Sequence, residues 1–125
     1  MGTWGPDNLD NDTGRDFLVS YIDSLGQVIN GLVTSKENVL KVFSDNYDEV
    51  HITVILSIII ALYDAFDETF HFELKDVERW RDIYLEAFDE YALDAGYSSF
   101  ASERRSVIEE TFEKLRQIMI ESNHV

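Results

Sequence analysis

Apolar side chains recur at spacings of one, three and four residues in the first third of the chain, at Phe17, Leu18, Tyr21, Ile22, Leu25, Val28, Ile29 and Leu32. This spacing predicts a helix with one apolar side. Thr13 and Asp16 have the spacing of a capping box and Asp12 is a competing cap, so the helix is expected to begin near residue 13. Gly26 and Gly31 lower the helix propensity of its second half, where the helix could break or end.

Three other segments carry apolar residues at helical spacing. A short helix is predicted after Ser35, ended by the polar residues 44–48, with the apolar positions Val39, Leu40, Val42 and Phe43. A long helix is predicted from Leu74 to a stop before Gly96, with the mainly aromatic stripe Val77, Trp80, Tyr84, Phe88 and Tyr91. We assign this stripe, and Trp80 in particular, to the core. A last helix, capped by Ser99 or Ser102, is predicted from Val107, Ile108, Phe112, Leu115, Ile118 and Met119.

Residues 49–66 form a continuous, mostly apolar run rich in β-branched side chains. A strand over residues 52–60 is therefore an alternative to a helix. The run contains no turn signal and is long for a strand, which favours a central helix buried by its neighbours. Together the five segments predict an all-α, single-domain bundle over residues 1–125, with an ordered N-terminal loop at 1–12 and a frayed tail at 121–125.

The net charge of the chain limits the kinds of molecule that it is expected to bind. The 125 residues include 25 Asp and Glu against 10 Lys and Arg, giving a formal net charge of -15. Binding to nucleic acid or to an anionic membrane needs the opposite balance, so neither partner is expected. The apolar run is also shorter than the roughly 20 residues that span a bilayer. Because there is no cysteine, a disulfide framework is excluded and a cytoplasmic location is expected.

The sequence holds no recognisable catalytic or metal-binding motif. Asn8, Asp10 and Asp12 alternate as calcium ligands do in an EF-hand, but Gly14 falls one place late and Val19 stands where the bidentate Glu belongs. The three histidines are too scattered for a ligand set. We therefore predict no enzyme activity, no cofactor and no metal site, with a carboxylate-dependent enzyme or metal-binding protein kept as an alternative.

The acidic residues gather in two stretches that lack Lys and Arg, between Lys41 and Lys75 and from residue 82 to 103. If the helices around these stretches pack antiparallel, the acids form one cluster and one outer stripe, which together are predicted to bind a basic partner: Asp64, Asp67, Glu68, Glu73, Asp82, Glu86, Asp89 and Glu90. A solvated helix face is the alternative. Surface pairs with local acids are expected for Arg79, Arg81, Arg104 and Arg105. The apolar run 50–66 also allows a homodimer that shares this helix.

The opening stretch carries a specific pattern of residues: Gly2-Thr3-Trp4-Gly5, then Asp10-Asn11-Asp12, then Asp16-Phe17. It resembles the start of the bacterial domain-of-unknown-function family 4259, whose members begin with Gly-x-Trp-Gly, an acidic Asn-Asp pair and an Asp followed by an aromatic residue. The resemblance covers about seventeen residues and implies no activity, substrate or catalytic residue. From the residues themselves, Trp4 is expected to fold back into the bundle as a structural anchor.

These observations favour a small, acidic, non-catalytic binding protein. Its most concrete form is an immunity or inhibitor protein that binds a basic protein toxin such as a nuclease, because acidic clusters capture basic partners rapidly and can imitate phosphates. The alternative is a cytoplasmic bacterial protein with a housekeeping or small-molecule role, whose charge serves only solubility.

Overall fold

The computed structural model describes residues 12–46, 49–66, 72–94 and 101–122. These residues form five helices: α1 (Asp12–Leu32), α2 (Lys36–Asp45), α3 (His51–Phe66), α4 (Leu74–Asp94) and α5 (Ala101–Ser122). The described residues contain no strand. The predicted all-α bundle is confirmed, and α3 excludes the alternative strand over residues 52–60.

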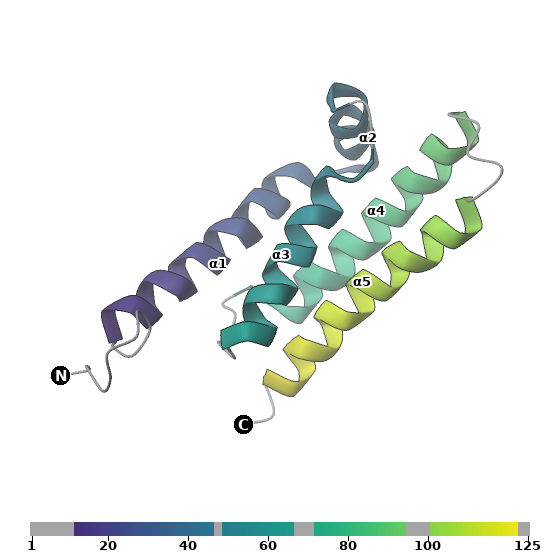
Figure 1. Ribbon diagram of the computed structural model, residues 1–125. Coiled ribbons are helices and arrows are strands. Elements are labelled where there is room, and N and C mark those ends of the chain that lie inside the picture. Colours follow the sequence, from purple (N-terminus) through teal and green to yellow (C-terminus); the bar gives the residue numbers. More distant parts are fainter. Residues whose placement is uncertain (1–11, 47–48, 67–71, 95–100, 123–125) are drawn as a thin grey trace.

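Four long helices lie roughly along one direction, and the short α2 crosses them at one end of the bundle (Figure 1). α3 packs against α1 and α5, while α4 packs against α5 and α2. Arg15 at the start of α1 donates a hydrogen bond from Nη1 to the carbonyl oxygen of Phe66 at 2.9 Å. Since Phe66 ends α3, the two helices run antiparallel.

α1 runs through both glycines, where a break or an end was a predicted outcome. Gly26 is buried, and a Cβ atom added there would lie 2.6 Å from Cδ1 of Phe72. The absence of a side chain lets the aromatic ring approach the α1 backbone, so packing compensates for the low helix propensity of glycine. A Cβ atom on Gly31 would meet nothing within 4 Å.

The helix starts agree with the sequence in part. The short helix predicted after Ser35 is α2, and Ser35 is its cap, since its hydroxyl oxygen accepts a hydrogen bond from the backbone N–H of Asn38 at 3.1 Å. α1 begins at Asp12, and Thr13 and Asp16 lie exposed near its start. Ser102 lies inside α5 and is not its cap, because that helix already begins at Ala101.

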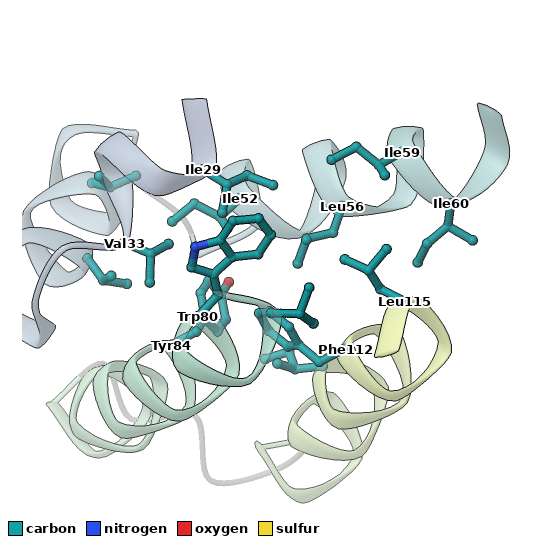
Figure 2. Close-up of a cluster of buried hydrophobic side chains, with 14 of the residues drawn as sticks. Ile29, Val33, Ile52, Leu56, Ile59, Ile60, Trp80, Tyr84, Phe112 and Leu115 are labelled. Carbon is teal, nitrogen blue, oxygen red and sulfur yellow. The ribbon is translucent and has the colours of Figure 1, made fainter. Parts of the chain in front are cut away.

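The core is built mainly from aromatic and β-branched side chains, with Trp80, Tyr84, Phe43, Phe88 and Phe112 among the largest that are fully buried. Figure 2 shows Trp80 of α4 pointing toward Ile52 and Leu56 of α3. The indole Nε1 donates to Oδ1 of Asn30 on α1 at 2.8 Å. Trp80 thereby connects three helices, in agreement with the structural role predicted for it.

Several predictions fall on residues outside the described ranges. They are residues 1–11 of the predicted ordered loop, the predicted anchor Trp4, the candidate cap Ser99 and residues 123–125 of the predicted frayed tail. Residues 121 and 122 of that tail are helical. Among the described residues, none of the helices has both the length and the apolar character needed to cross a membrane.

Candidate functional site

Four of the predicted binding residues lie on the solvent side of α4. Their side chains are 70%, 66%, 53% and 45% exposed for Asp82, Glu86, Asp89 and Glu90, respectively. Their spacing of three and four residues places them along one side of the helix, opposite the buried stripe that contains Trp80 and Tyr84. The outer stripe predicted from sequence is therefore present and accessible.

Basic side chains from distant segments partly neutralise this stripe. Nζ of Lys36 on α2 lies 3.4 Å from Oε1 of Glu90 and 3.8 Å from Oε1 of Glu86. Nε of Arg105 on α5 lies 2.8 Å from Oδ1 of Asp89. The hydrogen bond with Glu90 raises the pKa of Lys36, and that with Asp89 raises the pKa of Arg105, because each carboxylate favours the charged cation.

The stripe continues into an open groove of about 430 Å³ between α4 and α5, whose lining includes Arg81, Glu109, Glu110 and Glu113. Arg81 pairs with Asp82 at 3.0 Å, and Arg116 lies 3.4 Å from Glu113. We define the acidic face as these seven carboxylates: Asp82, Glu86, Asp89, Glu90, Glu109, Glu110 and Glu113. Their neighbouring cations are Lys36, Arg81, Arg105 and Arg116, so seven negative against four positive charges leave an excess of three.

The structure describes only two of the four acids in the other predicted cluster. Asp64 at the end of α3 pairs with Lys114 of α5 at 3.3 Å, and Glu73 pairs with Lys75 at 3.3 Å. Asp67 and Glu68 lie outside the described residues. Asp64 and Glu73 are each paired with a cation, as are the four acids on α4. The acids on α4 are joined by three more in the groove with α5, so we take the acidic face as the candidate binding surface.

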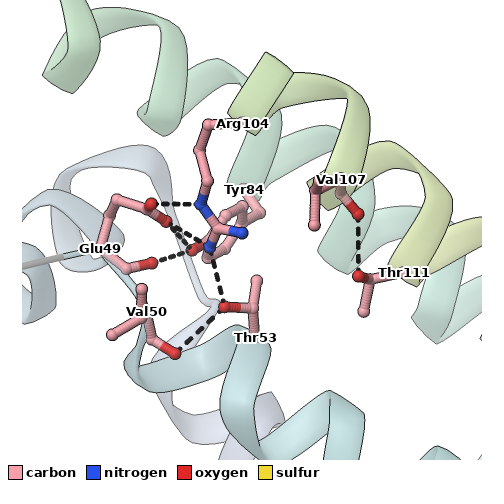
Figure 3. A network of polar contacts seen from close by, with 7 residues as sticks. All are labelled: Glu49, Val50, Thr53, Tyr84, Arg104, Val107 and Thr111. Carbon is pink, nitrogen blue, oxygen red and sulfur yellow. Dashed lines mark hydrogen bonds and ion pairs between the residues drawn. The ribbon is translucent and has the colours of Figure 1, made fainter. Parts of the chain in front are cut away.

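Arg104 was expected to pair with local acids at the surface, but it pairs with a distant buried one. It reaches 55 positions back to Glu49, which is only 2% exposed. The guanidinium donates from Nη2 to Oε2 of Glu49 at 2.9 Å and from Nε to Oε1, and Nη2 also donates to Oγ1 of Thr53 at 3.1 Å (Figure 3). Arg79 pairs with the local acid Asp76 at 3.8 Å as expected, and it also donates hydrogen bonds to Oδ1 of Asn30 and the carbonyl oxygen of Val33.

Tyr84 completes this buried network. Its hydroxyl lies 3.0 Å from Oε2 of Glu49 and also contacts the Glu49 carbonyl oxygen. Either oxygen can accept the hydrogen bond that the hydroxyl donates (Figure 3). Within the described part of the chain, every buried side-chain nitrogen and oxygen has a hydrogen-bond partner. The network joins the start of α3 to α4 and α5 and is enclosed, so we assign it to the stability of the bundle.

Burial raises the pKa of Tyr84 well above its ordinary value, and the charge of Glu49 adds to the shift. The unfolded chain releases this proton near pH 10 while the folded chain retains it, so the stability that Tyr84 contributes is lost as pH rises above 10. At pH 8, Tyr84→Phe is expected to lower the free energy of unfolding by about 1–3 kcal/mol. The difference between the two proteins should then shrink by about 1.4 kcal/mol per pH unit above pH 10 in urea titrations. A difference that is constant from pH 8 to 11 would contradict this.

Among the described residues, no three His, Asp or Glu side chains are grouped so that they could hold a metal ion. Comparisons with protein-family models, with curated proteins and with solved structures gave no match. The resemblance of the opening residues to family 4259 therefore stays a prediction.

Proposed function

We propose that this chain is a non-catalytic binding protein that captures a basic protein through the acidic face. The observation that carries the proposal is the excess of carboxylates there, with the four on α4 between 45% and 70% exposed. Such a surface attracts a positively charged partner over long distances and speeds its association. The finer form of the proposal is an immunity or inhibitor protein that neutralises a cationic toxin such as a nuclease.

The internal ion pairs of the acidic face are compatible with this role. Lys36, Arg81 and Arg105 are 29–39% exposed at their side chains, and the acids they contact are more exposed still. Exposed ion pairs contribute only about 0–1 kcal/mol each, so cations of a partner can replace them at small cost. The groove between α4 and α5 adds acids that a basic side chain could reach from the same side.

The test compares two variants with the same net charge. Replacement of Asp82, Glu86, Asp89 and Glu90 by Asn or Gln removes four negative charges from the acidic face, and the same change at Asp12, Asp16, Asp45 and Glu121 removes four from elsewhere on the surface. Each protein is immobilised, exposed to bacterial lysate at 50 and 300 mM salt, and the retained proteins are identified by mass spectrometry. We expect the wild type and the second variant to retain basic proteins. The first variant should retain at least about tenfold less basic protein than the wild type.

Two results would overturn the proposal. Equal retention by both variants would show that the acidic face has no special part in binding. Failure of the wild type to retain any basic protein at low salt, where attraction between charges is strongest, would favour the alternative in which the charge serves only solubility.

A further inference from the structure

The outermost line of positions on α3 is uncharged, with the exposed side chains of His51 and Asp64 on either side of it. Its exposed positions are spaced by three and four residues: Val50, just before the helix, then Val54, Ile58, Ala61 and Ala65. Val54 is 52% exposed and Ile58 40%. The buried positions Ile52, Leu56 and Ile59 lie on the opposite side of the helix, directed toward the core (Figure 2).

The neighbouring helices extend this apolar strip. α1 contributes Phe17, Tyr21 and Val28, with Phe17 74% exposed, and α5 contributes Val107. On α1 these side chains lie on the edge away from α4, because Gly26 and Asn30 occupy the edge that meets Phe72 and Trp80. Among the described residues, seven of the eight exposed large hydrophobic side chains therefore lie on one side of the molecule, and Leu93 of α4 is the exception.

We name this surface the apolar face, formed by Val50, Val54, Ile58, Ala61, Ala65, Phe17, Tyr21, Val28 and Val107. Its accessible area is on the order of 700 Å², above the few hundred Å² that a monomer usually exposes and close to the roughly 800 Å² per partner of a standard interface. The four carboxylates on α4 lie on the opposite side of the bundle, since α3 and α4 meet across the core and their outer sides point in opposite directions (Figure 2). Glu110 of α5 borders the apolar face beside Ala61 and Val107.

We propose that two copies of the chain associate through their apolar faces, with the two α3 helices antiparallel about a twofold axis. A twofold interface must be complementary to itself. α3 meets this requirement because Ala61 and Ala65 at one end leave space for Val50 and Val54 at the other end of the second helix, while Ile58 lies near the axis. The small side chains allow close approach of the helices.

Charge also favours a second copy over a different partner. With a net charge of -15, two copies repel each other in most orientations. This arrangement brings the uncharged lines of the two α3 helices together and holds the exposed carboxylates of both α4 helices at the outside of the dimer. A basic partner, in contrast, would find on the outer side of α3 only Asp64, which already pairs with Lys114. The inference is independent of the proposed function, because a different surface carries it.

Light scattering coupled to size exclusion, from about 1 µM to 500 µM, tests the proposal. The wild type should approach twice the monomer mass of 14.5 kDa as concentration rises. Ile58→Glu should raise the dissociation constant at least tenfold, because a carboxylate would be buried at the axis. Leu93→Glu is the matched control, since Leu93 is 82% exposed on α4 and should leave the dimer unchanged. Circular dichroism establishes that both variants fold.

A second measurement locates the axis. The natural chain has no cysteine, so Ile58→Cys introduces a single thiol that should form an intermolecular disulfide on mild oxidation, whereas Leu93→Cys should not. High salt should preserve this dimer while it weakens capture of basic proteins, which separates the two proposals. A wild type that remains at 14.5 kDa throughout, or equal effects of Ile58→Glu and Leu93→Glu, would overturn the inference.

Discussion

Replacing Arg104 by methionine is expected to lower the free energy of unfolding by about 3–5 kcal/mol. The change removes the two hydrogen bonds that hold the carboxylate of Glu49, which is 2% exposed and cannot turn to water for replacement partners. Tyr84 would remain as a donor, but it carries no positive charge. Equilibrium unfolding in urea, followed by circular dichroism at pH 7, measures the loss.

The second half of this experiment removes both charges. Glu49→Leu combined with Arg104→Met should be clearly more stable than the sum of the single changes predicts, because neither charge is then left buried without its counterpart. Arg105→Met is the control, since its ion pairs with Asp89 and Glu109 are exposed and should contribute less than about 1 kcal/mol. Additive effects of the Glu49 and Arg104 changes would show that the pair is not coupled.

Replacing Trp80 by alanine is the other change expected to cost about 3–5 kcal/mol. The indole is 0% exposed and fills the space between α1, α3 and α4, so truncation leaves a large cavity. Circular dichroism is the appropriate readout, because the change removes one of only two tryptophans.

Trp80→Phe separates packing from hydrogen bonding at this position. Oδ1 of Asn30 would still accept a hydrogen bond from Nη2 of Arg79 at 2.8 Å, so this oxygen keeps a hydrogen-bond donor. Loss of the indole N–H should therefore cost about 1 kcal/mol. The smaller phenyl ring adds the cost of a small cavity, but Trp80→Phe should still be less harmful than Trp80→Ala. A loss below about 1 kcal/mol for Trp80→Ala would contradict the central place assigned to the indole.

The helices could be predicted because their apolar residues repeat at helical spacing. Trp80, Tyr84 and Phe88 of the predicted stripe are all buried, and the absence of a turn signal in residues 49–66 correctly favoured helix α3. Gly26 shows where local propensity is insufficient. Its low propensity pointed to a weak or broken helix, whereas the continuation of α1 depends on Phe72, which follows 46 positions later.

The candidate sites were less predictable, because ion pairs join residues that are far apart in sequence. The stretches around Glu86 and Glu90 contain no base, yet Lys36 reaches both from α2. Nothing local distinguishes Arg104 from Arg105, although one enters the core and the other stays at the surface. The outer stripe of acids on α4 could be predicted because it depends only on helical spacing.

The contacts that hold α1 in place have a consequence for the order of synthesis. Asn30 accepts hydrogen bonds from Arg79 and Trp80, which follow it by 49 and 50 positions. α1 is made first, but the residues that cover and fix it are made much later. At about 5–20 residues per second, translation of that interval takes roughly 2–10 s. During this time the apolar side of the nascent α1, including Ile22 and Ile29, can pack against α2 and α3 but has no α4, so its burial is completed only after translation has passed Trp80.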